Sequence, residues 1–149
     1  MKPYSRLLVP TDGSELSDAA VDHALKLAKA TGARITFLHA QPNVPLPVMG
    51  MGQMLDARTM DALINANRKD TERILAAAQE RARLAGVPAS TEGISSDQPH
   101  RAIIDAAERL NCDLIVMASH GRGGLSGLLL GSETQRVLVH VRCPVLVYR

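Results

Sequence analysis

The chain has 149 residues, of which 46% are hydrophobic and 21% are charged, and its formal net charge is +2. This composition is typical of a globular protein, and so small a charge favours neither nucleic-acid nor membrane-surface binding. No apolar run approaches the length of a membrane span, and no signal-peptide pattern precedes the first strand. The two cysteines lack metal-ligand spacing. We therefore expect a cytoplasmic protein.

The first half of the chain predicts two strands around one helix. Residues 6–10 form an apolar run that reads as a buried strand, with Pro10 at its end. A tight turn follows, and Ser14 at its end is a candidate N-cap for a helix that Gly32 closes. Residues 34–39 read as the second strand. Residues 40–55 are rich in proline and glycine and predict a loop.

The second half predicts three more helices and three more strands. A long helix is expected from residue 56 to residue 85, where Gly86 and Pro88 end it. Residues 89–94 read as a polar edge strand and residues 97–110 as a helix with Pro99 in its first turn. Residues 114–117 form a buried strand. The last helix is expected at residues 132–140 and the last strand at residues 144–148.

Strands that alternate with helices five times predict an α/β fold, a doubly wound five-stranded parallel sheet with helices on both faces. Residues 1–149 are expected to form a single domain. Ligands of such sheets bind beyond the carboxyl ends of the strands, where the strand order reverses. If the order is 3-2-1-4-5, the loops after strands one and four face each other, so Asp12 meets the loop that begins near Ala118.

Residues 117–134 run from a buried strand through a glycine-rich loop to the start of a helix. Ser132 is a candidate N-cap, with Gln135 completing a capping box. Unpaired backbone N–H groups and close-approaching glycines suit a phosphate cradle. The loop has neither the lysine of a Walker motif nor the third glycine of a dinucleotide fingerprint. The alternative is a flexible surface loop that happens to be rich in glycine.

The spacing in this loop is Ala118-x2-Gly121-x9-Gly131-Ser132. It resembles the nucleotide-binding motif of the universal stress protein family, Gly-x2-Gly-x9-Gly-Ser/Thr, with Ala118 in place of the first glycine. The resemblance covers almost the whole chain, including residues 7–14, 112–117 and 143–147. It implies a five-stranded Rossmann-like sheet, a homodimer and ATP binding in a stress-response or regulatory protein.

The resemblance also implies roles for individual residues. Asp12 would lie near the ribose and the metal-bound phosphates. The adenine and ribose region would be lined by Pro10, Thr11, Ala40 and Met117, and the phosphates would be held by Gly121, Gly131, Ser132, Glu133 and Thr134. Ala118, His120 and Arg122 complete the predicted site, with His120 shaping the loop or touching phosphate.

Asp12 has two possible roles. A carboxylate beside phosphates is repelled unless a cation or a ribose hydroxyl intervenes, which favours Mg²⁺ held indirectly, through water or through the phosphates. The alternative is a turn residue that accepts backbone N–H bonds near the start of the helix. Ser119 and His120 beside it do not match the Gly-x-Ser-x-Gly pattern of a hydrolase nucleophile, so acyl transfer is disfavoured.

Three functions remain open. We expect ATP to be sensed rather than rapidly consumed, because no general base is evident. A nucleotidyl-transfer or slowly ATP-hydrolysing enzyme is the second reading, although the loop after the first strand, residues 11–14, lacks the motifs of adenylate-forming enzymes. The third is a dimer of the same fold that binds no nucleotide.

Three further expectations concern the periphery. Residues 44–54, which contain Met49, Met51 and Met54, are either a flap over the adenine end of the cleft or a disordered surface loop. The last strand is expected to be an apolar sheet edge that pairs with a second copy, through Val145, Leu146, Val147 and Tyr148. Cys112 and Cys143 both precede strands, so they are expected at the end opposite the ligand and close to each other.

Overall fold

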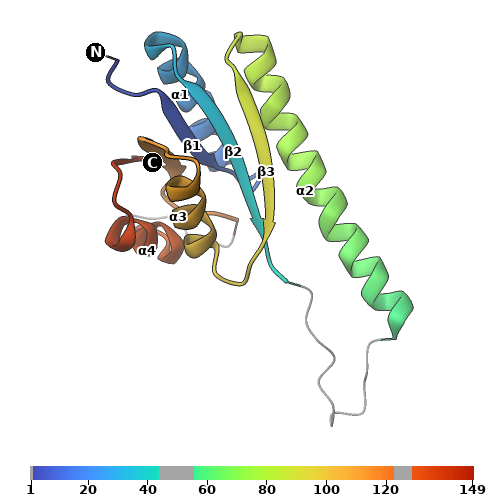
Figure 1. The fold of residues 1–149 in the computed structure, drawn as a ribbon. Helices are drawn as coiled ribbons and strands as arrows, with labels where there is room; N and C mark the ends of the chain where they lie inside the picture. Colours follow the sequence, from blue (N-terminus) through green and yellow to red (C-terminus); the bar gives the residue numbers. More distant parts are fainter. Residues whose placement is uncertain (1, 44–55, 123–128) are drawn as a thin grey trace.

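The computed structural model describes residues 2–43, 56–122 and 129–149. Its elements follow in the order β1 (Arg6–Pro10), α1 (Glu15–Thr31), β2 (Arg34–Gln41), α2 (Ala57–Ala85), β3 (Ala89–Ser95), α3 (Pro99–Arg109), β4 (Leu114–Ala118), α4 (Ser132–His140) and β5 (Val145–Tyr148). The strands form one parallel sheet in the order β3-β2-β1-β4-β5. The predicted fold class and strand order are therefore confirmed (Figure 1).

Alternate residues of the central strands face opposite sides of the sheet, and each side has its own hydrophobic core. Leu7 and Val9 of β1 pack with residues of α1 and α2, whereas Leu8 packs with residues of α3 and α4. This alternation follows from the period of two residues in a strand. Both faces are apolar because helices cover both of them, as parallel sheets require.

The caps of the first two helices arise from local hydrogen bonds. The Ser14 hydroxyl accepts a bond from the backbone N–H of Ser17, and Gly32 ends α1 at φ 73°, which only glycine adopts at little cost. The Asp56 carboxylate accepts a bond from the N–H of Thr59 in the same way. The prediction of Ser14 as an N-cap and of Gly32 and Gly86 as ends is confirmed.

The predicted capping box of the last helix is wrong. Gly131 occupies the N-cap position, no side chain caps α4, and Ser132 is the first helical residue. The Gln135 side chain donates to the carbonyl of Leu130 rather than reaching back to the cap. The predicted bounds of this helix, residues 132–140, are confirmed, whereas its N-cap lies one residue before the predicted Ser132. Smaller shifts occur at α3, which begins at Pro99 and ends at Arg109, and at β3, which continues to Ser95.

The helix α2 is much longer than the strands it covers. Its 29 residues span roughly 43 Å at 1.5 Å per residue, and Figure 1 shows its N-terminal half extending beyond the carboxyl ends of the strands. The buried residues of α2 begin at Thr71. The stretch around Asn67 and Asp70 therefore lies where the helix passes the edge of the sheet at which ligands of this fold class bind.

Candidate functional site

A cleft of about 420 Å³ lies at the carboxyl ends of the strands, within the size range of small-molecule sites. Eleven of the thirteen predicted site residues line it, namely Pro10, Thr11, Asp12, Ala40, Met117, Ala118, His120, Gly121, Arg122, Glu133 and Thr134. Gly131 and Ser132 do not line it. The cleft is bounded by the ends of β1, β2 and β4, by the starts of α3 and α4, and by the middle of α2.

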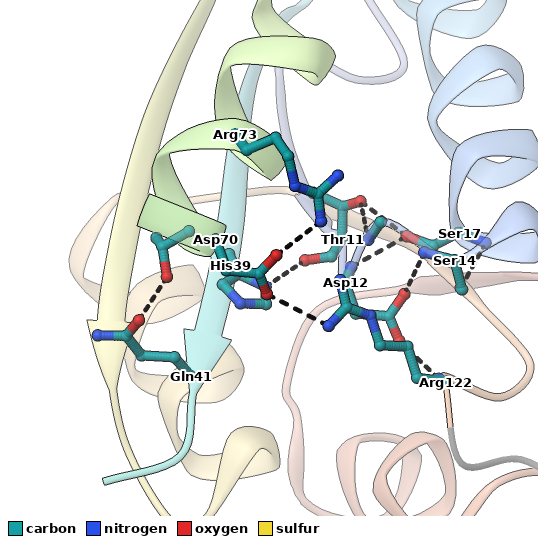
Figure 2. A network of polar contacts seen from close by, with 11 residues as sticks. Thr11, Asp12, Ser14, Ser17, His39, Gln41, Asp70, Arg73 and Arg122 are labelled. Carbon is teal, nitrogen blue, oxygen red and sulfur yellow. Dashed lines mark hydrogen bonds and ion pairs between the residues drawn. The ribbon is translucent and has the colours of Figure 1, made fainter. Parts of the chain in front are cut away.

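The Asp12 carboxylate closes one wall of the cleft through two backbone hydrogen bonds. One oxygen accepts from the N–H of Ser14, at 2.9 Å, and the other accepts from the N–H of Arg122, at 2.8 Å (Figure 2). The first bond shapes the turn before α1, and the second joins the loops after β1 and β4. Each oxygen still has a second lone pair, because a carboxylate oxygen accepts up to two hydrogen bonds.

A series of hydrogen bonds between buried residues holds the loop after β1 in place. The Ser17 hydroxyl donates to the Thr11 hydroxyl at 2.8 Å and accepts from the backbone N–H of Asp12 at 3.2 Å. His39 Nδ1 lies 2.8 Å from the Thr11 carbonyl oxygen and must carry a proton, since a carbonyl only accepts. Thr11, Ser17 and His39 are all buried, so their satisfied bonds give the loop a defined shape.

The loop after β4 approaches Asp12 very closely at Gly121. A Cβ atom at this position would lie 2.5 Å from the Asp12 carboxylate, a separation that forces one of them to move. The next residue, Arg122, donates its backbone N–H to Asp12 and its guanidinium to Asp70 of α2, at 3.3 Å. Figure 2 shows Arg122 between the two carboxylates. The glycine is therefore needed for contact between two loops of the protein itself.

Gly131 holds the other end of this loop against residues 119 and 120. Its N–H donates to the Ser119 carbonyl at 2.7 Å. A Cβ atom on Gly131 would lie 3.1 Å from the Cα of His120 and 3.2 Å from the same carbonyl oxygen. Its φ of −61° is ordinary, so close packing rather than backbone conformation favours glycine here. The predicted phosphate contact of Gly131 stays a prediction, beside these contacts with the protein.

The Ser119 hydroxyl lies 3.1 Å from His120 Nδ1. Ser119 is buried, whereas His120 lines the cleft. Within the described residues, no carboxylate hydrogen-bonds to His120, so the arrangement lacks the third member that would orient the histidine as a general base.

Two predicted site residues of α4 line the cleft, and their side chains form hydrogen bonds with other residues of the protein. The Thr134 hydroxyl donates to the Ala118 carbonyl at 3.1 Å, which links α4 to the end of β4. The Glu133 carboxylate accepts from the backbone N–H of His100 at 2.8 Å, lies 2.9 Å from His100 Nδ1 and pairs with Arg136 at 2.7 Å. Although burial opposes it, these bonds together lower the pKa of Glu133. Its carboxylate thus joins α3 to α4.

Sequence reasoning missed the wall contributed by α2. Asn67 and Asp70 line the cleft, and the Thr71 hydroxyl donates to the Gln41 side chain beside it. The lining residues that were not predicted are Ser17, Leu38, His39, Gln41, Pro42, Asn67, Asp70, Pro99 and Ile103. A signal for α2 was present, because Asn67, Asp70 and Thr71 continue the inward face of Ile74 toward the helix start.

Asp70 is shared between two arginines. Its carboxylate lies 2.6 Å from Arg73 and 3.3 Å from Arg122. The hydrogen bond from Arg73 is the main reason that the pKa of Asp70 is lowered, with smaller contributions from Arg122. Its side chain is 38% exposed and that of Arg122 is 50% exposed. This ion pair therefore stands at the mouth of the cleft rather than in its interior.

The two cysteines are partly buried and pack against the core on the α3 and α4 side, next to the starts of β4 and β5. Burial is the main cause that raises the pKa of both thiols, to about 11 for Cys112, where the neighbouring Cys143 adds to the effect. Both are therefore poor nucleophiles near neutral pH. Their predicted position, opposite the cleft and near each other, is confirmed.

The predicted flap, residues 44–54, lies outside the described residues. In the described part of the chain, no three His, Cys, Asp or Glu side chains cluster in a way that could hold a metal ion. The helices of that part include none long and apolar enough to cross a membrane.

A comparison with known proteins places these features in a family. Residues 3–149 match the model of the universal stress protein family. Universal stress protein MJ0531 of Methanocaldococcus jannaschii is 32% identical over 149 residues, which cover 98% of this chain and 82% of that protein. The structure of universal stress protein UspA from Lactobacillus plantarum is similar, with a TM-score of 0.80, 25% identity and 98% coverage of both chains.

A universal stress protein solved in complex with cAMP is also similar. It has a TM-score of 0.73 and 28% identity, with 99% of this chain and 98% of that chain covered. The match to the family model spans nearly the entire length of the sequence, and the strand order agrees with the fold of these neighbours. The chain therefore belongs to the universal stress protein family.

Proposed function

We propose that this protein binds ATP with Mg²⁺ in the cleft and acts as a regulatory, nucleotide-sensing protein rather than as an efficient enzyme. The observation that carries the proposal is the meeting of the loops after β1 and β4, where the Asp12 carboxylate binds the backbone N–H of Arg122 beside a cleft of about 420 Å³. This is the edge at which doubly wound sheets bind nucleotides.

The lining of the cleft suits a nucleotide at both of its ends. Leu38, Ala40, Ile103 and Met117 offer apolar surface to a base. His120, Gly121 and Arg122 lie at the loop after β4, where a cationic side chain can meet phosphate charge. The likeness to a universal stress protein in complex with cAMP supports an adenine ligand of this kind.

The oxygen atoms available in the cleft suit a Mg²⁺ ion that has few ligands from the protein. Asp12 keeps one free lone pair on each oxygen, and Mg²⁺ readily keeps several waters while bridging phosphates. We propose that Asp12 holds the ion through water. When bound, the ion would neutralise phosphate charge beside the three acidic side chains of the cleft wall, Asp12, Asp70 and Glu133.

Calorimetry on protein stripped of ligand by unfolding and refolding tests the proposal. Titrations with ATP with and without Mg²⁺, AMP, cAMP and GTP should give heat for the adenine ligands, with the strongest binding for Mg-ATP. Ala40→Leu should fill the base end of the cleft and weaken binding at least tenfold. Thr91→Leu on β3 adds the same side chain at an exposed position outside the cleft and should leave binding unchanged.

The alternatives give different results in the same experiments. A protein that binds none of these ligands at millimolar concentration, yet unfolds cooperatively, would be a member of the fold that lacks nucleotide binding. Turnover of ATP to ADP faster than about once per minute would favour the enzymatic reading. Slow hydrolysis over hours is compatible with a sensor.

We further propose that two copies associate through β5. This strand is the outermost one beside β4, and its four residues are only partly buried in the single chain. Leu138 and Val139 of the adjoining α4 are 40% and 75% exposed. A second copy related by a two-fold axis would cover this edge and these apolar side chains together.

A further inference from the structure

Arg122 lies at the junction of the two loops, and its guanidinium is paired with a carboxylate of the protein. Its backbone N–H binds Asp12, and its Nη1 pairs with Asp70 of α2. Its Nη2 lies only 3.3 Å from the position of a Cβ atom on Gly13. The side chain is thus laid along the mouth of the cleft, between the turn after β1 and α2.

The other acidic groups of the described lining have partners that a ligand would not need to disturb. Asp12 accepts two backbone N–H groups, and Glu133 is bound to His100 and Arg136. Asp70 differs, because one of its two arginine partners, Arg122, also lines the cleft. A phosphate that binds Arg122 must compete with Asp70 for the same guanidinium.

Such an exchange is energetically accessible. Exposed ion pairs contribute little to stability, and the Arg122 and Asp70 side chains are 50% and 38% exposed. If Arg122 leaves, Asp70 keeps its bond of 2.6 Å to Arg73 on the same helix. The carboxylate therefore keeps a cationic partner when Arg122 turns to a ligand, so the exchange leaves no unpaired charge on α2.

We propose that Asp70 determines which adenine ligands the cleft accepts by competing with ligand phosphate for Arg122. The inference rests on the proposed nucleotide binding and deepens it. Asp70 is a specificity-determining residue that disfavours ligands in proportion to their negative charge. Asp70 should not weaken the binding of a neutral nucleoside. It should weaken the binding of cAMP, which carries one negative charge, to a small extent. It should weaken the binding of ATP most, unless Mg²⁺ offsets the charge of the phosphates.

The test compares the affinities of adenosine, cAMP, ATP and Mg-ATP for wild-type protein and for Asp70→Asn. The asparagine is nearly isosteric but carries no charge. The affinity for ATP should rise about five- to tenfold, that for cAMP about two- to threefold, and that for adenosine should stay within twofold. The gain should shrink in 0.5 M salt, because exposed charges are screened there.

A matched control separates this role from the general effect of removing an acidic side chain. Asp22 of α1 also forms an exposed ion pair with an arginine, Arg81, at 2.7 Å, and it does not line the cleft. Asp22→Asn should change no affinity by more than twofold. Thermal unfolding without ligand should show that both variants fold.

The double variant Asp70→Asn with Arg122→Met tests whether Asp70 acts through Arg122. Competition for the guanidinium predicts that the gain in ATP affinity is at least halved when Arg122 is already absent. A gain that persists undiminished would overturn the competition, since the carboxylate would then act on the ligand directly.

Two other outcomes also overturn the inference, and each differs from a failure of the proposed function. If wild-type protein binds ATP and Asp70→Asn leaves the ratio of ATP to adenosine affinity unchanged, Asp70 sets no preference. If Asp70→Asn weakens Mg-ATP but not metal-free ATP, Asp70 belongs to the ion's environment instead. If wild-type protein binds no adenine ligand at all, the proposed function itself is wrong and the inference falls with it.

Discussion

The backbone N–H of Arg122 donates a hydrogen bond of 2.8 Å to the carboxylate of Asp12, 110 positions earlier in the chain. This contact joins the loops that follow the two central strands, β1 and β4. The same carboxylate also caps the turn at Ser14. One side chain therefore sets both the path into α1 and the position of the glycine-rich loop.

Replacing Asp12 with asparagine should loosen this junction. An amide offers one oxygen and one NH₂ group, so either the N–H of Ser14 or that of Arg122 would face a donor in place of an acceptor. We expect the free energy of unfolding without ligand to fall by about 1–2 kcal/mol, measured by urea denaturation. Asp61→Asn, at an exposed position of α2, is the control. Equal stabilities for both variants would contradict the dual role of Asp12.

Gly131→Ala should destabilise the protein in the absence of any ligand. The added methyl group would press on His120 and on the Ser119 carbonyl at 3.1–3.2 Å, so this part of the loop must shift. A cost of about 1–2 kcal/mol is typical of such overpacking. Thermal unfolding of ligand-free protein measures it. An unchanged melting temperature, accompanied by lost ATP binding, would instead favour the predicted direct contact of Gly131 with phosphate.

Ser132→Ala separates stability from binding at the neighbouring position. Because Gly131, not Ser132, is the N-cap of α4 and no side chain caps that helix, the loss of the hydroxyl should change the free energy of unfolding by no more than about 0.5 kcal/mol. Any weakening of ATP binding would then report a direct ligand contact. A destabilisation of 1 kcal/mol or more would show that the hydroxyl supports the helix after all.

Acid should remove the contribution of Glu133. Its pKa is lowered in the folded protein, mainly by the bonds from His100 against the opposing effect of burial. A carboxyl with a lowered folded pKa stabilises the protein above its unfolded value of about 4.5, and that stabilisation disappears as the pH falls through the folded value. The difference in melting temperature between wild type and Glu133→Gln should therefore be constant near pH 7 and shrink progressively as the pH falls below 4.5 toward the lowered folded pKa.

An exposed glutamate on α3 provides the comparison for this pH series. Glu108 is exposed, and none of the described hydrogen bonds involves its side chain. Glu108→Gln should follow wild type at every pH. If Glu133→Gln and Glu108→Gln behave alike, the link between α3 and α4 contributes nothing to stability.

Val147→Lys should weaken the proposed dimer. The substitution adds a charged side chain to β5, and inward or central charges on an edge strand oppose pairing with another copy. Sedimentation velocity at micromolar concentration should show wild type as a dimer and the variant shifted toward monomer. Leu84→Lys, at a 72% exposed position near the end of α2, should leave the dimer intact. A monomeric wild type would refute the proposed interface.

The strands and the first caps were predictable because they depend on local patterns. The strand order, on which the meeting of Asp12 with the glycine-rich loop depends, was expected from the fold class and is confirmed. The apolar runs around Leu8 and Ile115 identify central strands, and parallel strands bring their carboxyl ends to one edge. Turn and cap residues such as Ser14 and Gly32 act on their immediate neighbours. These features need no knowledge of how distant helices pack.

The α2 wall and the partners of Glu133 depend on tertiary placement. Asp70 reaches the cleft only because α2 passes the end of β2 at that turn, and the helical period alone does not fix this position. The sequence predicts phosphate contact for Glu133 mainly through its backbone, but it does not show that the carboxylate meets His100 of a different helix. Similarly, the space beside Gly131 is filled by His120, a contact that glycine spacing cannot distinguish from one with a ligand.

The position of β1 between β2 and β4 constrains how the chain can assemble. The first 95 residues contain β1, β2 and β3, which pair in sequence order, but one side of β1 stays bare until β4 arrives. During synthesis this bare strand is an exposed apolar edge that is open to wrong partners. Asp12 can contact Arg122 only after β4 has paired with β1. A nucleotide that binds at this contact would therefore stabilise the completed sheet and lower the fraction of incompletely folded chains that can aggregate.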